Sequence, residues 1–266
     1  MRFDHAIESR RLAPGRYSYT FDGSWFGIGG PHGGFLMAVI LRAMQCELAP
    51  DRHPRSLTVH FASRIEQGEV EIEVREERRG GRMSTLSARV IQNGSLMALA
   101  LAAFSTARDG PDFTDAMFPE AQAPEALTPM PHGVHSPAFA RQFDYRPGIG
   151  GPVFHAGSRA ELGGWMRLNE APRVVDASAI ACFTDAWMPA IFTRIDFRAI
   201  APTVEMTVYF RSEFPTPDLR PEDFVLGVFR SDRVEGGFWE EDGELWTRDG
   251  RLIAQSRQLA LLIPAT

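Results

Sequence analysis

Residues 176–211 read DASAIACFTDAWMPAIFTRIDFRAIAPTVEMTVYFR and carry the strongest structural signals in the chain. Asp176 is suited to cap a helix, and the following residues are apolar on nearly every face, which predicts a buried helix. Asp185 is the charged residue inside this apolar segment. A lone carboxylate there costs several kcal/mol unless it is paired, hydrogen-bonded or protonated. Asp185 is therefore the centre of the candidate site, and the alternative is a core-edge Asp that bonds locally.

The same pattern of elements occurs earlier in the chain. A Gly-rich turn at 29–34 precedes an apolar segment at 35–48, which predicts a second buried helix. Strands are predicted at 56–61 and 69–74, and the dipeptide Asn93-Gly94 predicts a tight hairpin between two further strands.

The two halves resemble a diverged internal repeat. SLTVHF, which ends at Phe61, matches EMTVYF, which ends at Phe210, and the Asn93-Gly94 turn matches Asp249-Gly250. A long buried helix wrapped by a curved antiparallel sheet is the hotdog fold. We therefore expect an α+β double hotdog, with two long central helices wrapped by a curved antiparallel β-sheet. Two unrelated α+β domains are the alternative.

The predicted domain limits follow from composition. Residues 107–137 are rich in Pro, Ala and acidic residues and have no sustained period, which is typical of a linker. The segment 1–106 is then an N-terminal hotdog, and 138–266 is a C-terminal hotdog.

Composition excludes several functions. The net charge is −6, and all 28 basic residues are Arg, scattered along the chain, so we expect no nucleic-acid partner. The absence of Lys from the sequence excludes Schiff-base catalysis and a P-loop lysine. Arginine suits the recognition of phosphate groups on a small ligand.

We predict no metal, no cofactor and no membrane insertion. Cys46 and Cys182 lie in apolar segments and are interpreted as core residues. Apart from His32, the histidines show no metal-ligand spacing, and a surface or core role is predicted for His5, His53, His60, His132, His135 and His155. No apolar run approaches eighteen residues and residues 1–12 resemble no signal peptide, so a soluble, cytoplasmic protein is expected.

Over most of its length the chain resembles bacterial acyl-CoA thioesterases of the thioesterase II (TesB-like) type. Four segments carry the resemblance: ERRGGRMSTLSARVIQNG at 77–94, FTDAWMP at 183–189, PTVEMTVYF at 202–210 and DGRLIAQSRQLALL at 249–262. The resemblance implies an enzyme of lipid metabolism that hydrolyses acyl-CoA to free acid and coenzyme A. Because hotdog proteins commonly associate through sheet edges, it also implies a homo-oligomer, a dimer or larger.

The resemblance assigns a catalytic trio to the C-terminal half. Its Asp, Thr and Gln fall on Asp185, Thr203 and Gln258. In the first half the positions that correspond to Thr203 and Gln258 are Pro54 and Ala102, so the N-terminal hotdog is expected to hold a degenerate site.

The trio suits hydrolysis. Asp185 can serve as the general base, and a Thr hydroxyl with a Gln amide can hold a water molecule, because both groups donate and accept hydrogen bonds. Direct attack by Asp185 to form a mixed anhydride is the alternative. Strand alternation places Thr203 on the face of Glu205 and opposite Met206, away from the interior, unless a bend near Pro202 turns it.

His32, Gly33 and Gly34 form the second candidate group. Single-hotdog thioesterases carry a similar His-Gly-Gly at the start of the central helix. By that analogy, the Gly33 and Gly34 amides at the positive end of the helix could bind the oxyanion. The alternative is a Gly-rich turn that only permits close packing.

Two other functions stay open. A non-catalytic acyl-CoA or lipid-binding protein would use the same fold, and a hotdog hydratase would carry an Asp and His pair that does not occur here. Among the remaining polar residues, 240–242 are interpreted as a solvated turn. The arginines considered for the phosphates of coenzyme A, without a choice among them, are Arg78, Arg79, Arg82, Arg211 and Arg257.

Overall fold

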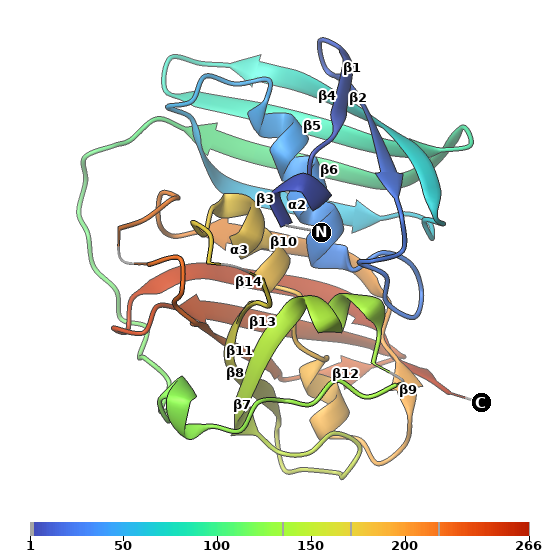
Figure 1. Cartoon of the computed structure of the whole chain (residues 1–266), viewed down its shortest axis with the longest axis vertical. Coiled ribbons are helices and arrows are strands. Elements are labelled where there is room, and N and C mark those ends of the chain that lie inside the picture. Colours follow the sequence, from blue (N-terminus) through green and yellow to red (C-terminus); the bar gives the residue numbers. More distant parts are fainter. Residues whose placement is uncertain (1–2, 135, 171, 218, 266) are drawn as a thin grey trace.

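The computed structural model describes residues 3–134, 136–170, 172–217 and 219–265, so His135 lies outside the described residues. One long antiparallel sheet dominates the molecule, in the strand order β1-β2-β4-β5-β6-β3-β10-β14-β13-β11-β8-β7, with β12 paired to β13 (Figure 1). The strands of the first half are β1 (Arg10–Ala13), β2 (Arg16–Phe21), β3 (His53–Phe61), β4 (Gly68–Arg79), β5 (Met83–Gln92) and β6 (Ser95–Ser105). Those of the second half are β7 (Phe143–Gly150), β8 (Ala160–Leu168), β9 (Ala199–Ile200), β10 (Thr203–Phe210), β11 (Val225–Ser231), β12 (Val234–Glu235), β13 (Phe238–Trp246), β14 (Leu252–Leu261) and β15 (Ile263–Pro264).

The two halves meet where β3 pairs with β10. In this pairing Thr58 lies opposite Thr207, and their hydroxyl oxygens are 2.9 Å apart. These two residues occupy the same position in the SLTVHF and EMTVYF segments. An element that pairs with its own repeat at the matching residue lies on a two-fold axis, so the strand register supports the internal repeat read from the sequence.

The helices correct one part of the predicted fold. The expectation of two long central helices is wrong: α2 covers Gly33–Gln45, 13 residues, but α3 covers only Ala177–Phe183, 7 residues. The remaining helices are short: α1 (Phe3–Ala6), η1 (Pro124–Ala126), η2 (Ala138–Gln142) and η3 (Ala190–Thr193).

The early end of α3 has a local cause. The hydroxyl of Thr184 donates to the carbonyl of Ala181 at 2.8 Å, which uses an acceptor near the end of the helix. Pro189 also disfavours helical geometry in the residue before it. Asp176 caps the other end as predicted, since its Oδ1 accepts from the N–H of Ala179 at 2.9 Å.

The helices α2 and α3 pack directly against each other near the β3–β10 pairing that joins the two halves of the sheet (Figure 1). A Cβ atom at Gly34 would lie 2.6 Å from the carbonyl oxygen of Cys182, so only glycine permits this approach. The predicted hairpin turn is also present, with Asn93 and Gly94 both at positive φ between β5 and β6.

Residues 106–137 run from the upper to the lower half of the molecule, and η1 is the only regular element among those of them that the structure describes (Figure 1). Part of this segment is packed, because Phe118 meets Trp246 edge-on with ring centroids 5.7 Å apart. The division into 1–106, 107–137 and 138–266 stays a prediction.

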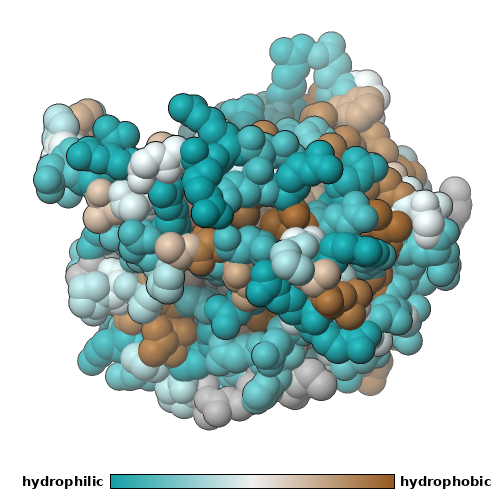
Figure 2. All heavy atoms as spheres, turned by 90° about the horizontal axis from the view of Figure 1, so that it is seen from above, coloured by the Kyte–Doolittle hydropathy of each residue, from teal (hydrophilic) through white to brown (hydrophobic). Residues whose placement is uncertain are grey.

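The surface is mixed in character. Seen from the end that carries β1, β2 and β4, it is mostly hydrophilic with apolar patches between the polar side chains (Figure 2). In the described ranges, no helix combines the length and the apolar character needed to cross a membrane. Cys182 is buried as predicted, but Cys46 is exposed because it caps the end of α2, so its assignment to the core is wrong.

Candidate active site

Asp185 lies just beyond α3 rather than inside a helix, and 19% of its side chain is exposed to solvent. Its Oδ2 accepts a hydrogen bond from the N–H of Gly34, at 2.8 Å, in the first turn of α2. No partner is within hydrogen-bond distance of Oδ1 among the residues that the structure describes. One oxygen of Asp185 is thus anchored, and the other is available.

His32 caps α2 and holds the backbone of Asp185. Its Nδ1 accepts from the N–H of Phe35 at 3.1 Å, so the ring hydrogen lies on Nε2. Nε2 donates to the carbonyl oxygen of Asp185 at 2.7 Å and lies 3.3 Å from its Oδ2. The ring is buried and stacks on Phe139, with centroids 4.3 Å apart. His32 therefore fixes the loop that presents the carboxylate.

Gly33 and Gly34 differ in what their amides do. The Gly34 N–H is used by Asp185, whereas the Gly33 N–H has no hydrogen-bond partner within the described part of the chain. A Cβ atom at Gly33 would lie 2.9 Å from Asp185 Oδ2 and 3.3 Å from the Phe61 ring. A free helix-terminal N–H therefore lies beside the carboxylate.

Thr203 and Gln258 form a second group on the sheet. The register of β10 shifts between Thr203, which pairs with Ala260, and Glu205, which pairs with Leu259. This bulge gives β10 one extra residue, so Thr203 turns to the same face as Gln258. Its hydroxyl donates to Gln258 Oε1 at 2.8 Å. The bend near Pro202 that the sequence left open is this bulge.

Glu241 joins this second group and was missed by sequence reasoning. The interpretation of 240–242 as a solvated turn is wrong, because they lie within β13, and Glu241 is only 5% exposed. Gln258 Nε2 donates to Glu241 Oε1 at 2.7 Å, and the N–H of Ala190 donates to its Oε2 at 2.6 Å. The alternation of buried residues along β13, with Trp239 and Glu241 on one face, was the signal that could have placed it.

Burial raises the pKa of Glu241 from its ordinary 4.5 to about 8. The two hydrogen bonds from Ala190 and Gln258 act in the opposite direction, and the charges of Asp185 and Asp242 raise the pKa further. The two carboxyl groups, Asp185 and Glu241, therefore interact electrostatically. No hydrogen bond joins Asp185 to Thr203 or Gln258 within the described ranges.

The raised pKa of Glu241 predicts how stability depends on pH. Between pH 4.5 and about 8 the folded protein keeps a proton on Glu241 that the unfolded chain releases. The stability from this group is complete below about pH 4.5 and is lost as the pH rises to about 8. We expect this slope, about 1.4 kcal/mol per pH unit, to vanish in Glu241→Gln. Denaturant titrations of both proteins from pH 5 to 9 measure it; parallel curves would contradict the prediction.

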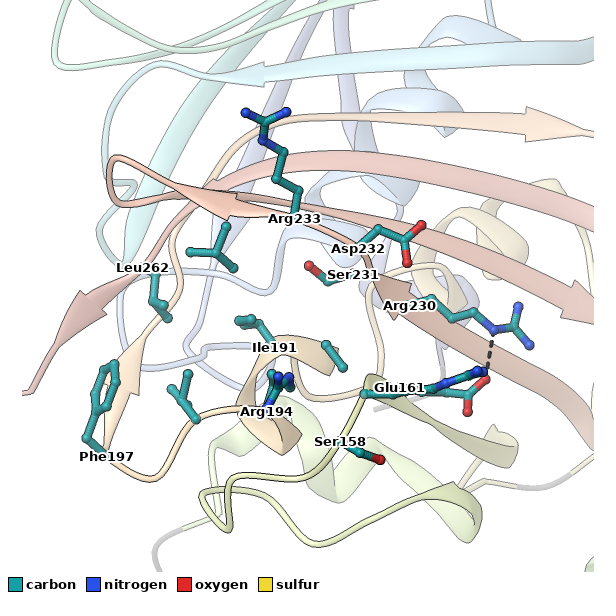
Figure 3. A pocket seen from close by; sticks show the side chains of 14 residues that line it. Ser158, Glu161, Ile191, Arg194, Phe197, Arg230, Ser231, Asp232, Arg233 and Leu262 are labelled. Atoms are coloured by element: carbon teal, nitrogen blue, oxygen red, sulfur yellow. Dashed lines mark hydrogen bonds and ion pairs between the residues drawn. The ribbon is translucent and has the colours of Figure 1, made fainter.

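A groove of about 860 Å³ has Ile191 of η3, Arg230 and Leu262 among the residues of its wall (Figure 3). Ile191 and Ala160 in its wall pack with Trp239 and Ala260. Trp239 and Ala260 lie two residues along their strands from Glu241 and Gln258, a distance of roughly 7 Å.

Arginines from three segments line this groove: Arg159, Arg194, Arg230 and Arg233. Arg230 is paired with Glu161 at 2.7 Å (Figure 3). Among the described residues, the guanidinium of Arg159 has no polar partner, and that of Arg194 bonds only the carbonyl of Gly157, at 2.8 Å. None of the five arginines considered from the sequence lines the groove.

In the part of the chain that the structure describes, no three His, Cys, Asp or Glu side chains form an arrangement that could hold a metal ion. The polar groups near Asp185 are hydrogen-bond donors and acceptors suited to a water molecule and a carbonyl oxygen.

Comparison with family models gives two matches that together span most of the chain. Residues 119–262 match the model of the acyl-CoA thioesterase C-terminal domain, and residues 21–105 match that of the acyl-CoA thioesterase N-terminal domain. No curated protein matches the chain.

Solved structures of similar fold cover the whole chain. A hotdog-fold protein of unknown function from Alicyclobacillus acidocaldarius is 25% identical with a TM-score of 0.90, covering 99% of this chain and 98% of its own. A proposed thioesterase II from Thermobifida fusca YX is 26% identical with a TM-score of 0.84, covering 98% and 97%. An acyl-CoA thioesterase II, TesB2, from Mycobacterium marinum shares the fold at 21% identity and a TM-score of 0.81, covering 100% and 99%.

Proposed function

The chain belongs to the acyl-CoA thioesterase family, with the hotdog fold of thioesterase II proteins, and is a thioester hydrolase, and from this we propose that it hydrolyses acyl-CoA at a site centred on Asp185. Thr203 and Gln258 complete the site, and the products are a free carboxylic acid and coenzyme A. The N-terminal half contributes the start of α2 in place of a second catalytic trio.

In the proposed reaction, Asp185 Oδ1 takes a proton from a water molecule whose oxygen attacks the thioester carbonyl carbon. The Thr203 oxygen accepts the second hydrogen of this water and so orients it. The Gly33 N–H, at the positive end of α2, donates to the oxygen that becomes negatively charged. The tetrahedral intermediate then collapses, the C–S bond breaks, and the departing thiolate of coenzyme A takes the proton that Asp185 had accepted from water.

The observation that carries the proposal is the bond from the Gly34 N–H to Asp185 Oδ2, at 2.8 Å. It crosses from the first half of the chain to the second and places a carboxylate beside a free helix-terminal amide. A base and an oxyanion donor are thus fixed in one place before substrate binds, which is how electrostatic stabilisation lowers a barrier.

Two alternatives remain distinguishable. Asp185 could attack the carbonyl itself, forming a mixed anhydride that water then hydrolyses. Single turnover in H₂¹⁸O separates direct attack by water, which labels the product acid in the first turnover, from an anhydride that water opens at the aspartyl carbonyl, which leaves the label on Asp185 and the product acid unlabelled. A non-catalytic acyl-CoA or lipid-binding protein would release no thiol at all.

A panel of acyl-CoA esters with detection of free thiol tests the proposed function directly. We expect one thiol and one acid per turnover, with the chain-length preference read from kcat/KM across the panel. Binding of acyl-CoA without release of thiol at any chain length would refute hydrolysis of this substrate class.

The groove supports a site for the phosphates of coenzyme A. Two of its guanidinium groups, those of Arg159 and Arg194, have no carboxylate partner among the described residues. Arginine binds phosphate through paired, charge-assisted hydrogen bonds. The groove is connected to Glu241 through η3, because Ile191 in its wall follows Ala190, whose N–H donates to Glu241 Oε2 at 2.6 Å.

We expect the double substitution Arg159→Ala/Arg194→Ala to raise KM for acyl-CoA about 10-fold and to leave kcat nearly unchanged, because it removes binding shared by ground and transition states. Hydrolysis of the same acyl group on N-acetylcysteamine, which lacks phosphates, should not change. The matched control Arg75→Ala/Arg89→Ala removes the same charge from exposed positions in the first half. An equal rise of KM for both substrates would contradict the assignment.

The homo-oligomeric state and the cytoplasmic location stay predictions. Light scattering measures the first, and cell fractionation measures the second.

A further inference from the structure

Glu241 is a buried carboxyl group that the proposed hydrolysis does not use. It lies on β13 directly opposite Gln258 on β14, and 5% of it is exposed. Both of its hydrogen-bond partners are donors: Gln258 Nε2 at 2.7 Å and the N–H of Ala190 at 2.6 Å. Burying a carboxyl group has a desolvation cost, so the position of Glu241 beside Gln258 suggests that it has a function there.

The contact between Glu241 and Gln258 determines how the amide is turned. A carboxylate has only acceptor atoms, so the amide must present its Nε2 to Glu241. Oε1 of Gln258 then faces Thr203, whose hydroxyl donates to it at 2.8 Å. Because the Thr203 hydrogen is used in this bond, the lone pairs of its oxygen are left to accept a hydrogen bond from water.

We propose that Glu241 is a positioning residue whose ionised carboxylate orients the amide of Gln258 and, through it, the hydroxyl of Thr203 toward the attacking water. This inference rests on the proposed hydrolysis at Asp185. When Glu241 is protonated, the hydrogen bonds that link Glu241, Gln258 and Thr203 reverse their direction. Its O–H then donates to Gln258 Oε1, the amide turns, Nε2 donates to Thr203, and the Thr203 hydroxyl points into the site as a donor.

The groups around Glu241 place the loss of its proton at about pH 8. Burial raises its pKa to about 8, with smaller upward contributions from Asp185 on the loop after α3 and Asp242 on β13, against the lowering effect of its two hydrogen bonds. The other charged groups on the elements packed against it are Glu240 and Glu244 on β13, Arg257 on β14, Arg230 on β11 and Asp232 beyond β11. Arg257 pairs with Asp242 at 3.2 Å, and Glu240 accepts from the N–H of Asp232 at 2.8 Å.

The pH dependence of kcat/KM for acyl-CoA hydrolysis tests this role. The wild-type value should rise as the pH passes through about 8, where half of Glu241 is ionised, and level off above that pH. In Glu241→Gln the side chain keeps its shape but no longer forces the amide orientation. We expect kcat/KM at pH 9 to fall about 10-fold, mainly through kcat, and the rise with pH to disappear. Glu240→Gln makes the same chemical change on the neighbouring residue and should keep the wild-type profile.

A merely structural role would lower the melting temperature of Glu241→Gln and leave the shape of its profile unchanged, and that outcome would overturn the inference. Glu241→Met, of similar volume, is the second variant and should also lack the rise. The wild-type profile is itself a test, because its failure to rise toward pH 8 would overturn the inference without any variant. If Asp185→Asn is inactive while Glu241→Gln keeps the wild-type profile, only this inference fails. If Asp185→Asn stays active, the proposed site fails.

Discussion

Asp185→Asn should lower kcat for acyl-CoA hydrolysis about 10³-fold, the largest effect expected from any single substitution in the chain. The amide still accepts from the Gly34 N–H through its oxygen, so the local structure is kept. It cannot take a proton from water, so the chemical step loses its base. Steady-state hydrolysis with free-thiol detection measures the change.

Asp176→Asn provides the matched control, because Asp176 precedes α3 and caps its N-terminus while Asp185 follows its C-cap. An Asn caps a helix about as well as an Asp, so this variant should keep both fold and turnover. Equal activities of Asp185→Asn and the wild type would mean that the carboxylate is a local structural group, as the alternative interpretation of the sequence holds.

Gly34→Ala should destabilise the protein by about 2–3 kcal/mol and reduce turnover strongly at the same time. The new Cβ atom would lie 2.6 Å from the carbonyl oxygen of Cys182 and 2.9 Å from Cβ of Asp185. Because the first of these atoms is backbone, α2 and α3 must move apart. The movement breaks the bond that anchors Asp185 Oδ2. Chemical denaturation and the thiol-release assay measure the two effects.

Gly29→Ala is the control for this substitution. A Cβ atom at Gly29 meets nothing within 4 Å, so the same change of residue type should leave stability and activity near the wild-type values. Normal activity in Gly34→Ala would show that the approach of α2 to Asp185 is not needed for the reaction.

Turn dipeptides and matching strand segments in the sequence predicted most of the fold. Asn93-Gly94 predicted a hairpin by its backbone preference alone, and the matching SLTVHF and EMTVYF segments predicted an internal repeat, which the pairing of Thr58 with Thr207 supports. The length of α3 could not be predicted in the same way. An apolar run continues through Trp187, but the helix ends at Phe183, where the hydroxyl of Thr184 donates to the carbonyl of Ala181.

The candidate site was predicted in part. The residue types at Asp185, Thr203 and Gln258 fitted hydrolysis, and the structure joins Thr203 directly to Gln258. Glu241 was missed because its two acidic neighbours made the segment look solvated, although strand alternation buries every second residue. The bulge that turns Thr203 inward leaves no clear mark in the sequence, since it depends on how two distant strands align.

The structure of Asp185→Asn in complex with an acyl-CoA tests the account most directly. We predict the thioester carbonyl oxygen within about 3.2 Å of the Gly33 nitrogen, and a water molecule between Asn at position 185 and the hydroxyl of Thr203, in line with the carbonyl carbon. A thioester bound away from the start of α2, with no water shared by these two side chains, would contradict the account.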